Sequence, residues 1–174
     1  MADYDKGLAL LQQLGGVDRP AVLDLFASVG AEDFGAEAVA FVYGGVYHRP
    51  GLSLPQRQLV TVAALAALGY ARAQLEFHVT AARNVGCTRE ELDETIRLAT
   101  GAPAEGGLDE RTQRLVLLAT HTATGGVAPE LTDHLRALHN AGARHQAVET
   151  ILHLAIYAGF PAALNALGRV PGAR

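Results

Sequence analysis

His78 is the residue of this sequence whose setting is best suited to proton transfer. On a helix it would border a stripe of apolar side chains formed by Leu75, Val79, Ala82 and Val85. An imidazole at the edge of an apolar face can be held partly desolvated with a pKa near neutrality, which a general acid or base needs. A core histidine that donates to a backbone carbonyl would show the same pattern, so both interpretations stay open.

Arginines near His78 in the sequence could bind a carboxylate through a bidentate guanidinium contact; they are Arg49, Arg57, Arg72 and Arg83. Arg49 is favoured among them because it precedes Pro50-Gly51, a rigid turn before the next helical segment. For each of the four, a solvated surface arginine is the alternative. Acid–base catalysis on a substrate with a carboxylate is therefore one interpretation of these residues, and packing and surface roles are the other.

Other common catalytic chemistries lack their residues. Seven histidines are present, but no His-x-x-x-His pair with a nearby acid occurs, and His134 and His139 are five positions apart, off one helical face. Nucleotide-binding glycine loops and the Gly-x-Ser-x-Gly elbow are absent as well. Cys87 is the single cysteine, which excludes an intrachain disulfide and a two-cysteine redox centre. We expect neither a metal nor a cofactor.

The composition indicates that helices position these residues. The chain of 174 residues is 49% apolar and only 6% aromatic, is rich in Ala, Leu and Gly, and has no Trp, which favours an all-α fold. A net charge of −4 leaves no basic stripe for nucleic acid. The N-terminus opens with acids, and no run of 18 apolar residues follows. We therefore expect a cytoplasmic protein without a nucleic-acid or membrane partner.

An internal repeat organises the chain. His78 and His134 are 56 positions apart, and the same offset relates Gly69 to Gly125 and further pairs along both halves. The pattern of each half predicts three helices. In the first half they span about 54–68, 72–85 and 89–100, and in the second about 110–123, 128–141 and 145–158. Caps predicted at Ser53 and at Thr88 with Glu91 begin two of these helices. We expect one domain over 1–174, with a helical arm (1–50), a first repeat unit (52–100) and a second (108–174) around a pseudo-twofold axis.

Several blocks of sequence together resemble the carboxymuconolactone decarboxylase family. They are Arg49-Pro-Gly-Leu-Ser, Leu59-Val-Thr-Val-Ala-Ala-Leu-Ala-Ala-Leu-Gly, Phe77-His-Val-Thr-Ala-Ala-Arg-Asn-Val-Gly-Cys and the C-terminal Leu152-His-Leu-Ala-Ile-Tyr-Ala-Gly-Phe-Pro. The resemblance implies the alkylhydroperoxidase-D-like helical bundle. In that superfamily single-unit members assemble as hexamers and two-unit members as trimers. For this two-unit chain it implies a homo-oligomer, with a trimer as the first expectation and a dimer as the second.

The resemblance also separates two branches of chemistry. The peroxidase branch uses a Cys-x-x-Cys pair ahead of the histidine and a glutamate on the preceding helix. Here Ala71 and Gln74 precede His78, and Gln58 stands near the glutamate position. The second unit lacks the cysteines too, so a thiol peroxidase is excluded.

The remaining implication is a cofactor-free carboxy-lyase that removes carbon dioxide from a carboxylated muconolactone or a related unsaturated acid in aromatic-compound catabolism. His78 would donate the proton, and Arg49 or Arg57 would bind the carboxylate or the enolate; the substrate-binding residues would be Tyr43, Tyr47, Arg83 and His134. Gly45 replaces the acid of the family's pattern and favours an alternative, an isomerisation or rearrangement in secondary metabolism. A non-catalytic binding or assembly protein is the third hypothesis, in which the histidines only pack.

Overall fold

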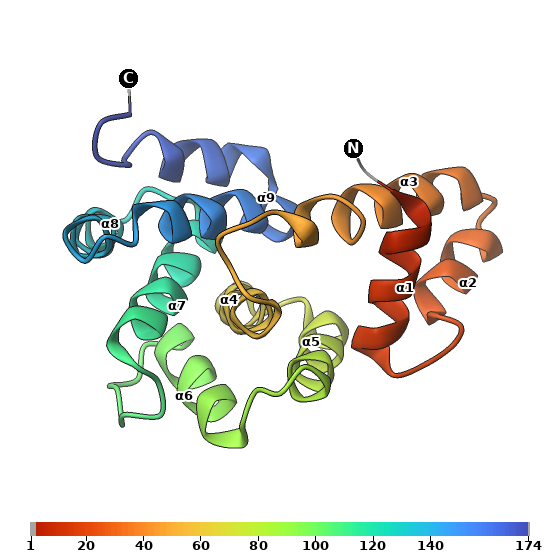
Figure 1. The fold of residues 1–174 in the computed structure, drawn as a ribbon, viewed down its shortest axis with the longest axis horizontal. Coiled ribbons are helices and arrows are strands. Elements are labelled where there is room, and N and C mark those ends of the chain that lie inside the picture. The colour runs from red at the N-terminus through yellow and green to blue at the C-terminus, as the bar shows by residue number, and fades with distance from the viewer. Residues whose placement is uncertain (1–2, 174) are drawn as a thin grey trace. The chain divides into compact units, whose positions relative to one another are not determined.

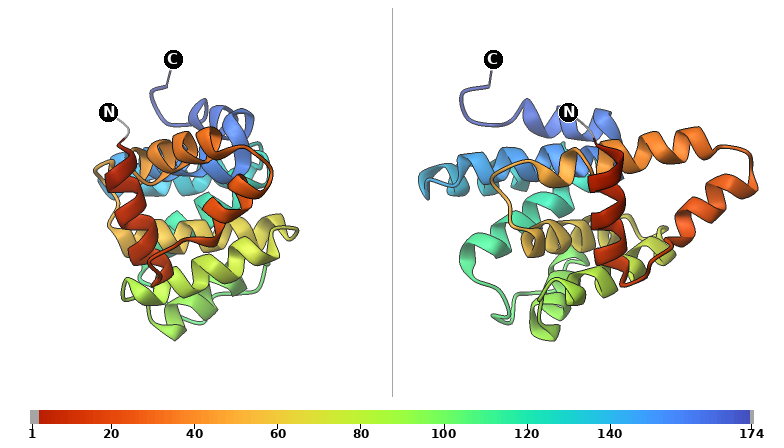
Figure 2. Two further views of the ribbon diagram at one scale, coloured as in Figure 1. Left: turned by 90° about the vertical axis from the view of Figure 1, so that its right-hand side faces the viewer. Right: turned by 45° about the vertical axis from the view of Figure 1, so that its right-hand side comes forward.

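The computed structural model describes residues 3–173, and every regular element among them is a helix, as predicted for an all-α protein (Figures 1 and 2). The chain divides into two compact units, Met1–Arg49 and Pro50–Arg174. The boundary falls where the sequence places the end of the N-terminal arm. Each unit is described by itself, and the prediction of a single domain stays a prediction.

The N-terminal unit contains three α-helices and a short 3₁₀ helix, α1 (Tyr4–Gly15), α2 (Ala21–Ser28), α3 (Glu32–Val42) and η1 (Val46–His48). The side chain of Asp3 caps α1 by accepting from the Lys6 amide. A Cβ on Gly7 would lie 2.5 Å from the Val39 carbonyl oxygen, so glycine permits the close packing of α1 on α3. By contrast, α2 has no buried residue.

The C-terminal unit contains six helices, α4 (Leu54–Leu68), α5 (Arg72–Asn84), α6 (Arg89–Ala99), α7 (Glu110–Ala123), α8 (Pro129–Asn140) and α9 (Arg144–Leu167). The capping boxes predicted at Ser53 and Thr88 both form, each with reciprocal bonds to the residue three positions on. In Figure 1, α4 is seen nearly end-on, with α5, α6, α7 and α9 around it. This central position explains why nine of its residues are buried.

The contacts between helices repeat from one half to the other. In the first half α4 packs on α5 and α6, and in the second half α7 packs on α8 and α9. Between the halves α4 packs on α7, α4 on α9 and α6 on α7. Each of these contacts has its counterpart when the halves are exchanged, which is the pattern of a pseudo-twofold arrangement, although the contact of α8 with α9 is not matched to the same extent between α5 and α6. The predicted internal repeat of three-helix units is therefore confirmed.

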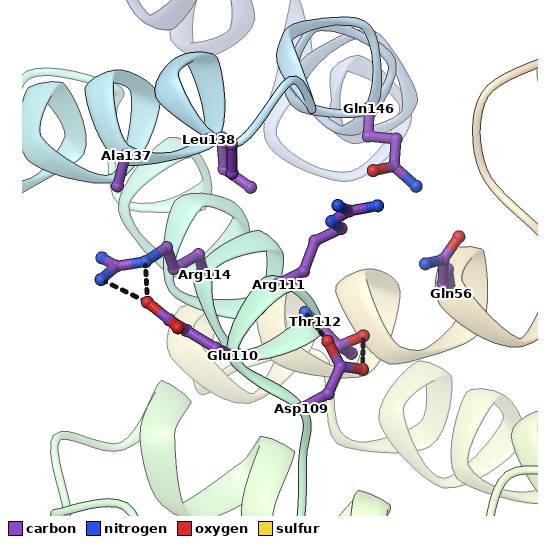
Figure 3. Close-up of a pocket in the computed structure, with 10 residues that line it drawn as sticks. Gln56, Asp109, Glu110, Arg111, Thr112, Arg114, Ala137, Leu138 and Gln146 are labelled. Atoms are coloured by element: carbon purple, nitrogen blue, oxygen red, sulfur yellow. Dashed lines mark hydrogen bonds and ion pairs between the residues drawn. The ribbon is translucent and has the colours of Figure 1, made fainter.

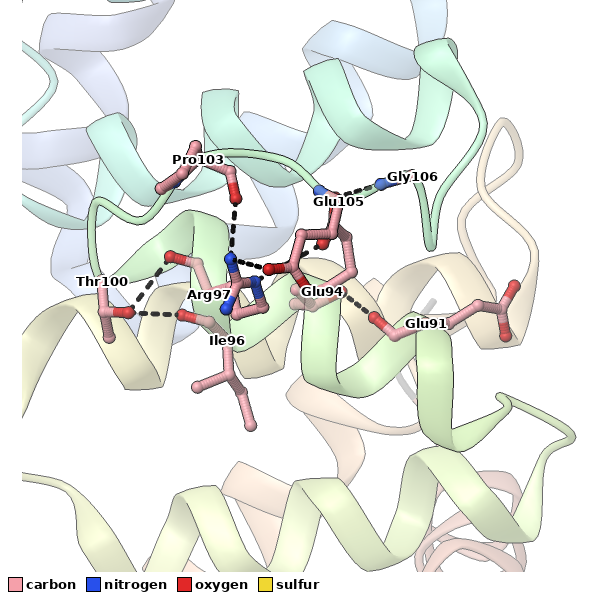
Figure 4. A network of polar contacts seen from close by, with 9 residues as sticks. Glu91, Glu94, Ile96, Arg97, Thr100, Pro103, Glu105 and Gly106 are labelled. Atoms are coloured by element: carbon pink, nitrogen blue, oxygen red, sulfur yellow. Dashed lines mark hydrogen bonds and ion pairs between the residues drawn. The ribbon is translucent and has the colours of Figure 1, made fainter.

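The segment that joins the halves is held by a polar network (Figure 4). The buried carboxylate of Glu94 accepts from the amides of Glu105 and Gly106, at 2.8 and 3.2 Å. The Arg97 guanidinium donates to the Pro103 carbonyl at 3.2 Å and pairs with Glu105 at 2.6 Å. These bonds satisfy backbone groups that a loop would otherwise leave to solvent and fix the path between α6 and α7.

Helix α9 is interrupted at Gly159, whose φ of 80° and ψ of 161° are not helical, two residues before Pro161. Beyond this kink the chain doubles back over the first part of the helix (Figures 1 and 2). By length and composition alone α9 could cross a membrane, and it is the one such helix among residues 3–173. Its packing against α4, α7 and α8 accounts for the apolar composition.

Candidate active site

His78 lies in the interior of the C-terminal unit with 3% of its surface exposed. Helix α5 carries it toward α4, where its Nδ1 lies 2.9 Å from Oε1 of Gln58. Its Nε2 faces α9, 3.4 Å from the hydroxyl oxygen of Tyr157. The rings of His78 and Tyr157 meet edge to face, with centroids 5.4 Å apart. Three helices thus fix the orientation of this imidazole.

The hydrogen bonds determine which nitrogen of His78 carries the proton. An amide oxygen can only accept, so Nδ1 is the protonated nitrogen and donates to Gln58. In the neutral ring Nε2 is then an acceptor, and the Tyr157 hydroxyl donates to it. His78 therefore presents its basic nitrogen to a phenol that carries a transferable proton.

A second buried histidine, His153, is held by Arg57 and Thr61 of α4. A guanidinium can only donate, so the Arg57 N–H group 3.3 Å from Nδ1 of His153 requires an acceptor there. The Nε2–H of His153 then donates to Oγ1 of Thr61 at 2.9 Å, and this hydroxyl donates to the Arg57 carbonyl at 2.8 Å. The two histidines consequently adopt opposite tautomers.

The Tyr157 ring connects these groups into one cluster. Its centroid lies 5.7 Å from that of His153 and 5.4 Å from that of His78. The site therefore combines a buried cation, Arg57, which contacts His153, with a second imidazole and a phenol. We use "the His78 cluster" for His78, Gln58, Arg57, Thr61, His153 and Tyr157.

Electrostatics keep both imidazoles neutral in the free protein. Burial lowers the pKa of His78 to about 3. Burial also lowers the pKa of His153 well below its usual value, and the neighbouring charge of Arg57 lowers it further. The sequence-based expectation of a pKa near neutrality for His78 is wrong, because the ring lies inside the fold and not at the edge of an apolar face.

Two of the predicted substrate-binding residues in this unit lie apart from the cluster's described contacts. Arg83 is exposed in the last turn of α5, where helical geometry turns it away from His78. His134 is half-buried and stacks on His121, with ring centroids 5.5 Å apart. Burial lowers the pKa of His134, and the charges of His121 and Arg114 act in the same direction. Their roles in binding stay predictions.

The predicted residues of the N-terminal unit form their own arrangement. The rings of Tyr43 and Tyr47 lie 5.1 Å apart, and burial raises the pKa of Tyr43 above its usual range. Arg49 lines a cleft of about 490 Å³ together with Lys6 and Gly45. A cation at a cleft fits a carboxylate-binding role, and the grouping of these residues with His78 stays a prediction.

The lone thiol is poorly suited to redox chemistry. Cys87 is buried, its Sγ lies 3.6 Å from the Pro55 carbonyl oxygen, and burial together with the charge of Glu91 raises its pKa to about 11. A thiol with this pKa is protonated at neutral pH and a weak nucleophile. Over residues 3–173 no group of three or more His, Cys, Asp or Glu side chains is placed to hold a metal ion.

Sequence reasoning missed His153 and Tyr157 as members of the site. They are four residues apart on α9, a spacing that places two side chains on one helical face. That spacing could have indicated that His153 and Tyr157 lie together. Their partners could not be predicted, because Arg57 and Thr61 are 96 and 92 positions away from His153 in the sequence. Gln58, in contrast, stands where the resemblance places a glutamate, and it does contact His78.

Comparison with known proteins identifies the family of the chain. The model of the carboxymuconolactone decarboxylase family matches the chain twice, over residues 32–104 and 96–170. The chain is also similar to 4-carboxymuconolactone decarboxylase from Acinetobacter baylyi, with 42% identity over 76 residues. That match covers 42% of this chain and 56% of the relative, so the chain spans about half of the relative's length. No solved structure matches the chain. Together the two family matches span most of the sequence, and the chain belongs to the carboxymuconolactone decarboxylase family.

Proposed function

We propose that this protein is a cytoplasmic carboxy-lyase that removes carbon dioxide from a carboxylated muconolactone or a related unsaturated lactone acid, without a cofactor, in aromatic-compound catabolism. Family membership and the similarity to 4-carboxymuconolactone decarboxylase support a decarboxylase-type reaction. The observation that carries the proposal is the His78 cluster, in which a buried guanidinium lies beside a tautomer-fixed imidazole and a phenol.

The reaction needs the protein at two points. When the bond between the ring carbon and the carboxylate carbon breaks, carbon dioxide leaves and the electron pair moves into the unsaturated lactone carbonyl. The resulting dienolate is stabilised by a nearby cation, a role for Arg57, with Arg49 as the second candidate. A proton must then reach carbon, and water restores that proton to the enzyme afterwards.

His78 is the proposed proton donor. In the free protein its imidazole is neutral, because burial holds its pKa at about 3. An anionic substrate close to the ring would favour the charged imidazolium and raise this pKa, so that substrate binding loads the ring with the proton it later delivers. Because Nδ1 already donates to Gln58, the added proton lies on Nε2, which faces the Tyr157 hydroxyl. The Tyr157 hydroxyl passes its own proton to carbon and takes up the proton of Nε2, so that His78 supplies the proton through this phenol.

Carbon dioxide release from freshly generated 4-carboxymuconolactone tests the proposal. Without added metal or nucleotide, the wild-type protein should turn the substrate over and His78→Ala should lose turnover by about 100-fold or more, the usual contribution of a positioned acid or base. His139→Ala, at an exposed histidine of α8, is the matched control and should keep full activity.

Each contrary result has a defined meaning. Turnover that persists in His78→Ala would remove His78 from the mechanism. Absence of turnover in the wild-type protein would reject the decarboxylase proposal and direct attention to an isomerisation or rearrangement, or to a binding role. Thermal melting of both variants shows whether a loss of activity comes from unfolding.

A further inference from the structure

A second cleft lies in the C-terminal unit, and none of its lining residues belongs to the His78 cluster. Its volume is about 550 Å³, and it opens between the starts of α4 and α7, the end of α8 and the start of α9 (Figure 3). Its walls are mainly charged and amide side chains, and Ala137 and Ala141 add a small apolar surface. A ligand in this cleft would therefore be held chiefly by charge and hydrogen bonds.

Arg111 is the one charged group of this cleft that forms no side-chain hydrogen bond or ion pair within residues 3–173. Both acids are engaged with other groups. Glu110 pairs with Arg114 at 3.0 Å, and Asp109 caps α7 by accepting from the amide and the hydroxyl of Thr112 at 3.0 and 2.6 Å. The hydrogen bonds from Thr112 lower the pKa of Asp109, and the charge of Arg111 adds to this effect as the last of several causes. No hydrogen bond ties the Arg111 guanidinium to that carboxylate, so its N–H groups can still donate to an anion from solution.

Two glutamine amides lie near this guanidinium. Figure 3 shows Arg111 extending toward Gln146, with Gln56 on the other side of the gap. The Oε1 atom of Gln56 accepts from the Ser53 amide in the capping box, which leaves its NH₂ group as the end available to the cleft. A cation and two amide donors face a common space.

The internal repeat provides a comparison within the same chain. The offset of 56 positions places Pro55 at the position of Arg111 and Glu90 at the position of Gln146. Compared with the first half, the later half therefore has an additional cation, Arg111, and lacks an acid, because Gln146 replaces Glu90. The acids that it gains, Asp109 and Glu110, are taken up by the cap and by Arg114. The two remaining differences, the additional arginine and the missing glutamate, both favour the binding of an anion.

We propose that this cleft binds a small organic carboxylate, held by the guanidinium of Arg111 and by the side-chain amides of Gln56 and Gln146. A carboxylate accepts two parallel N–H bonds from a guanidinium, and the apolar body of the ligand lies against Ala137 and Ala141. This site is independent of the proposed decarboxylase reaction, because it shares no residue with the His78 cluster.

Titration of the full-length protein with benzoate, followed by NMR, tests the site. Benzoate combines a carboxylate with an apolar body, and benzamide has the same shape without the charge. Benzoate should shift the side-chain NH₂ signals of Gln56 and Gln146 in a saturable manner, whereas benzamide should leave them in place. Arg111→Gln should weaken benzoate binding by about tenfold or more, as expected for the loss of a charge-assisted contact.

Three controls make the result decisive. Arg89→Gln removes an arginine that is 81% exposed on α6 and should leave benzoate binding unchanged. His78→Ala should also leave it unchanged, since a benzoate effect that disappears there would belong to the His78 cluster. Equal shifts by benzoate and inorganic phosphate would show a general anion site and overturn the proposed ligand class, and equal affinity of wild type and Arg111→Gln would overturn the site itself.

Discussion

In the candidate active site, two buried neutral histidines each carry their proton on a defined ring nitrogen. His78 carries its proton on Nδ1 and His153 on Nε2, because Gln58 can only accept and Arg57 can only donate at those atoms. Replacing either partner by one of opposite hydrogen-bonding character would force the ring into the other tautomer. The residue types around each imidazole thus determine where a proton can be given or received.

The buried histidines also predict how stability depends on pH. The pKa of His78 is about 3 in the folded protein and near 6.5 when unfolded, so the unfolded chain binds more protons between these values. The contribution of the neutral ring to the free energy of unfolding is therefore fully present above about pH 6.5. It is lost as the pH is lowered, with a slope of up to roughly 1.4 kcal/mol per pH unit for each such histidine. His153, whose pKa is also lowered, adds to the same trend.

Thermal melting between pH 7.5 and pH 4.5 checks this prediction. The melting temperature should fall with decreasing pH, and the fall should be smaller in His78→Gln than in the wild-type protein. His139→Gln, at an exposed position, should retain the wild-type slope. A slope unchanged in His78→Gln would mean that this ring is already charged or accessible in the folded state.

At the scale of elements, Gly126 controls how closely the end of α9 packs on the turn after α7. A Cβ at Gly126 would lie 2.4 Å from the Ala162 carbonyl oxygen and 2.9 Å from the Ala166 amide nitrogen, both backbone atoms of α9. Asn165 strengthens the same contact by donating to the Gly125 carbonyl at 3.0 Å. Backbone atoms cannot move aside as a flexible side chain can.

Gly126→Ala should therefore lower the free energy of unfolding more than Gly142→Ala. Both glycines have a φ of 71°, so both substitutions carry the same left-handed strain of about 1–2 kcal/mol. Only Gly126 adds a clash, because nothing lies within 4 Å of a Cβ at Gly142. Urea denaturation of the two variants measures the difference, and equal losses would show that α9 accommodates the methyl group.

The helices were predictable from sequence because their signals are local. The ranges 54–68 and 110–123 agree with α4 and α7, since caps, glycine stops and apolar periodicity all lie within the helix they define. The predicted end at 158 also falls next to the kink at Gly159. The reversal beyond it could not be predicted, because it depends on the contact of α9 with the turn at Gly126.

The site was less predictable for the same physical reason. His78 and Arg57 stood out by type and by resemblance, but the burial that lowers the pKa of His78 arises from three helices that come together only in the fold. His153 and Tyr157 lie in an apolar segment typical of a core helix, where a histidine is as readily a packing residue. Long-range partners give such residues their role, and no local pattern records them.

At the scale of the whole molecule, α2 leaves an apolar stripe on the surface. Val22 and Leu25 of α2 and Val29, the residue that follows the helix, are spaced as on one helical face, and their exposed fractions are 39%, 63% and 71%. Contiguous exposed apolar side chains are typical of surfaces that associate. We expect the protein to form a homo-oligomer through this stripe, with a trimer first and a dimer second.

Light scattering of the purified protein measures the assembly. A trimer has three times the chain mass of 18.3 kDa and a dimer has twice that mass. The double variant Leu25→Glu with Val29→Glu should shift the mass toward the single chain, because charge on the stripe opposes its burial. Ala27→Glu places one charge on the opposite side of α2 and should leave the assembly intact; an oligomer that survives the double variant would place the interface elsewhere.

The joint between α6 and α7 has a consequence for how the protein responds to dilution. Its path is fixed by the bonds of Glu94 and Arg97 to the segment around Glu105. A short tether gives two linked partners an effective concentration on the order of millimolar, whatever the concentration of the protein in solution. Dilution therefore weakens contacts between separate chains but leaves the effective concentration of one half for the other unchanged.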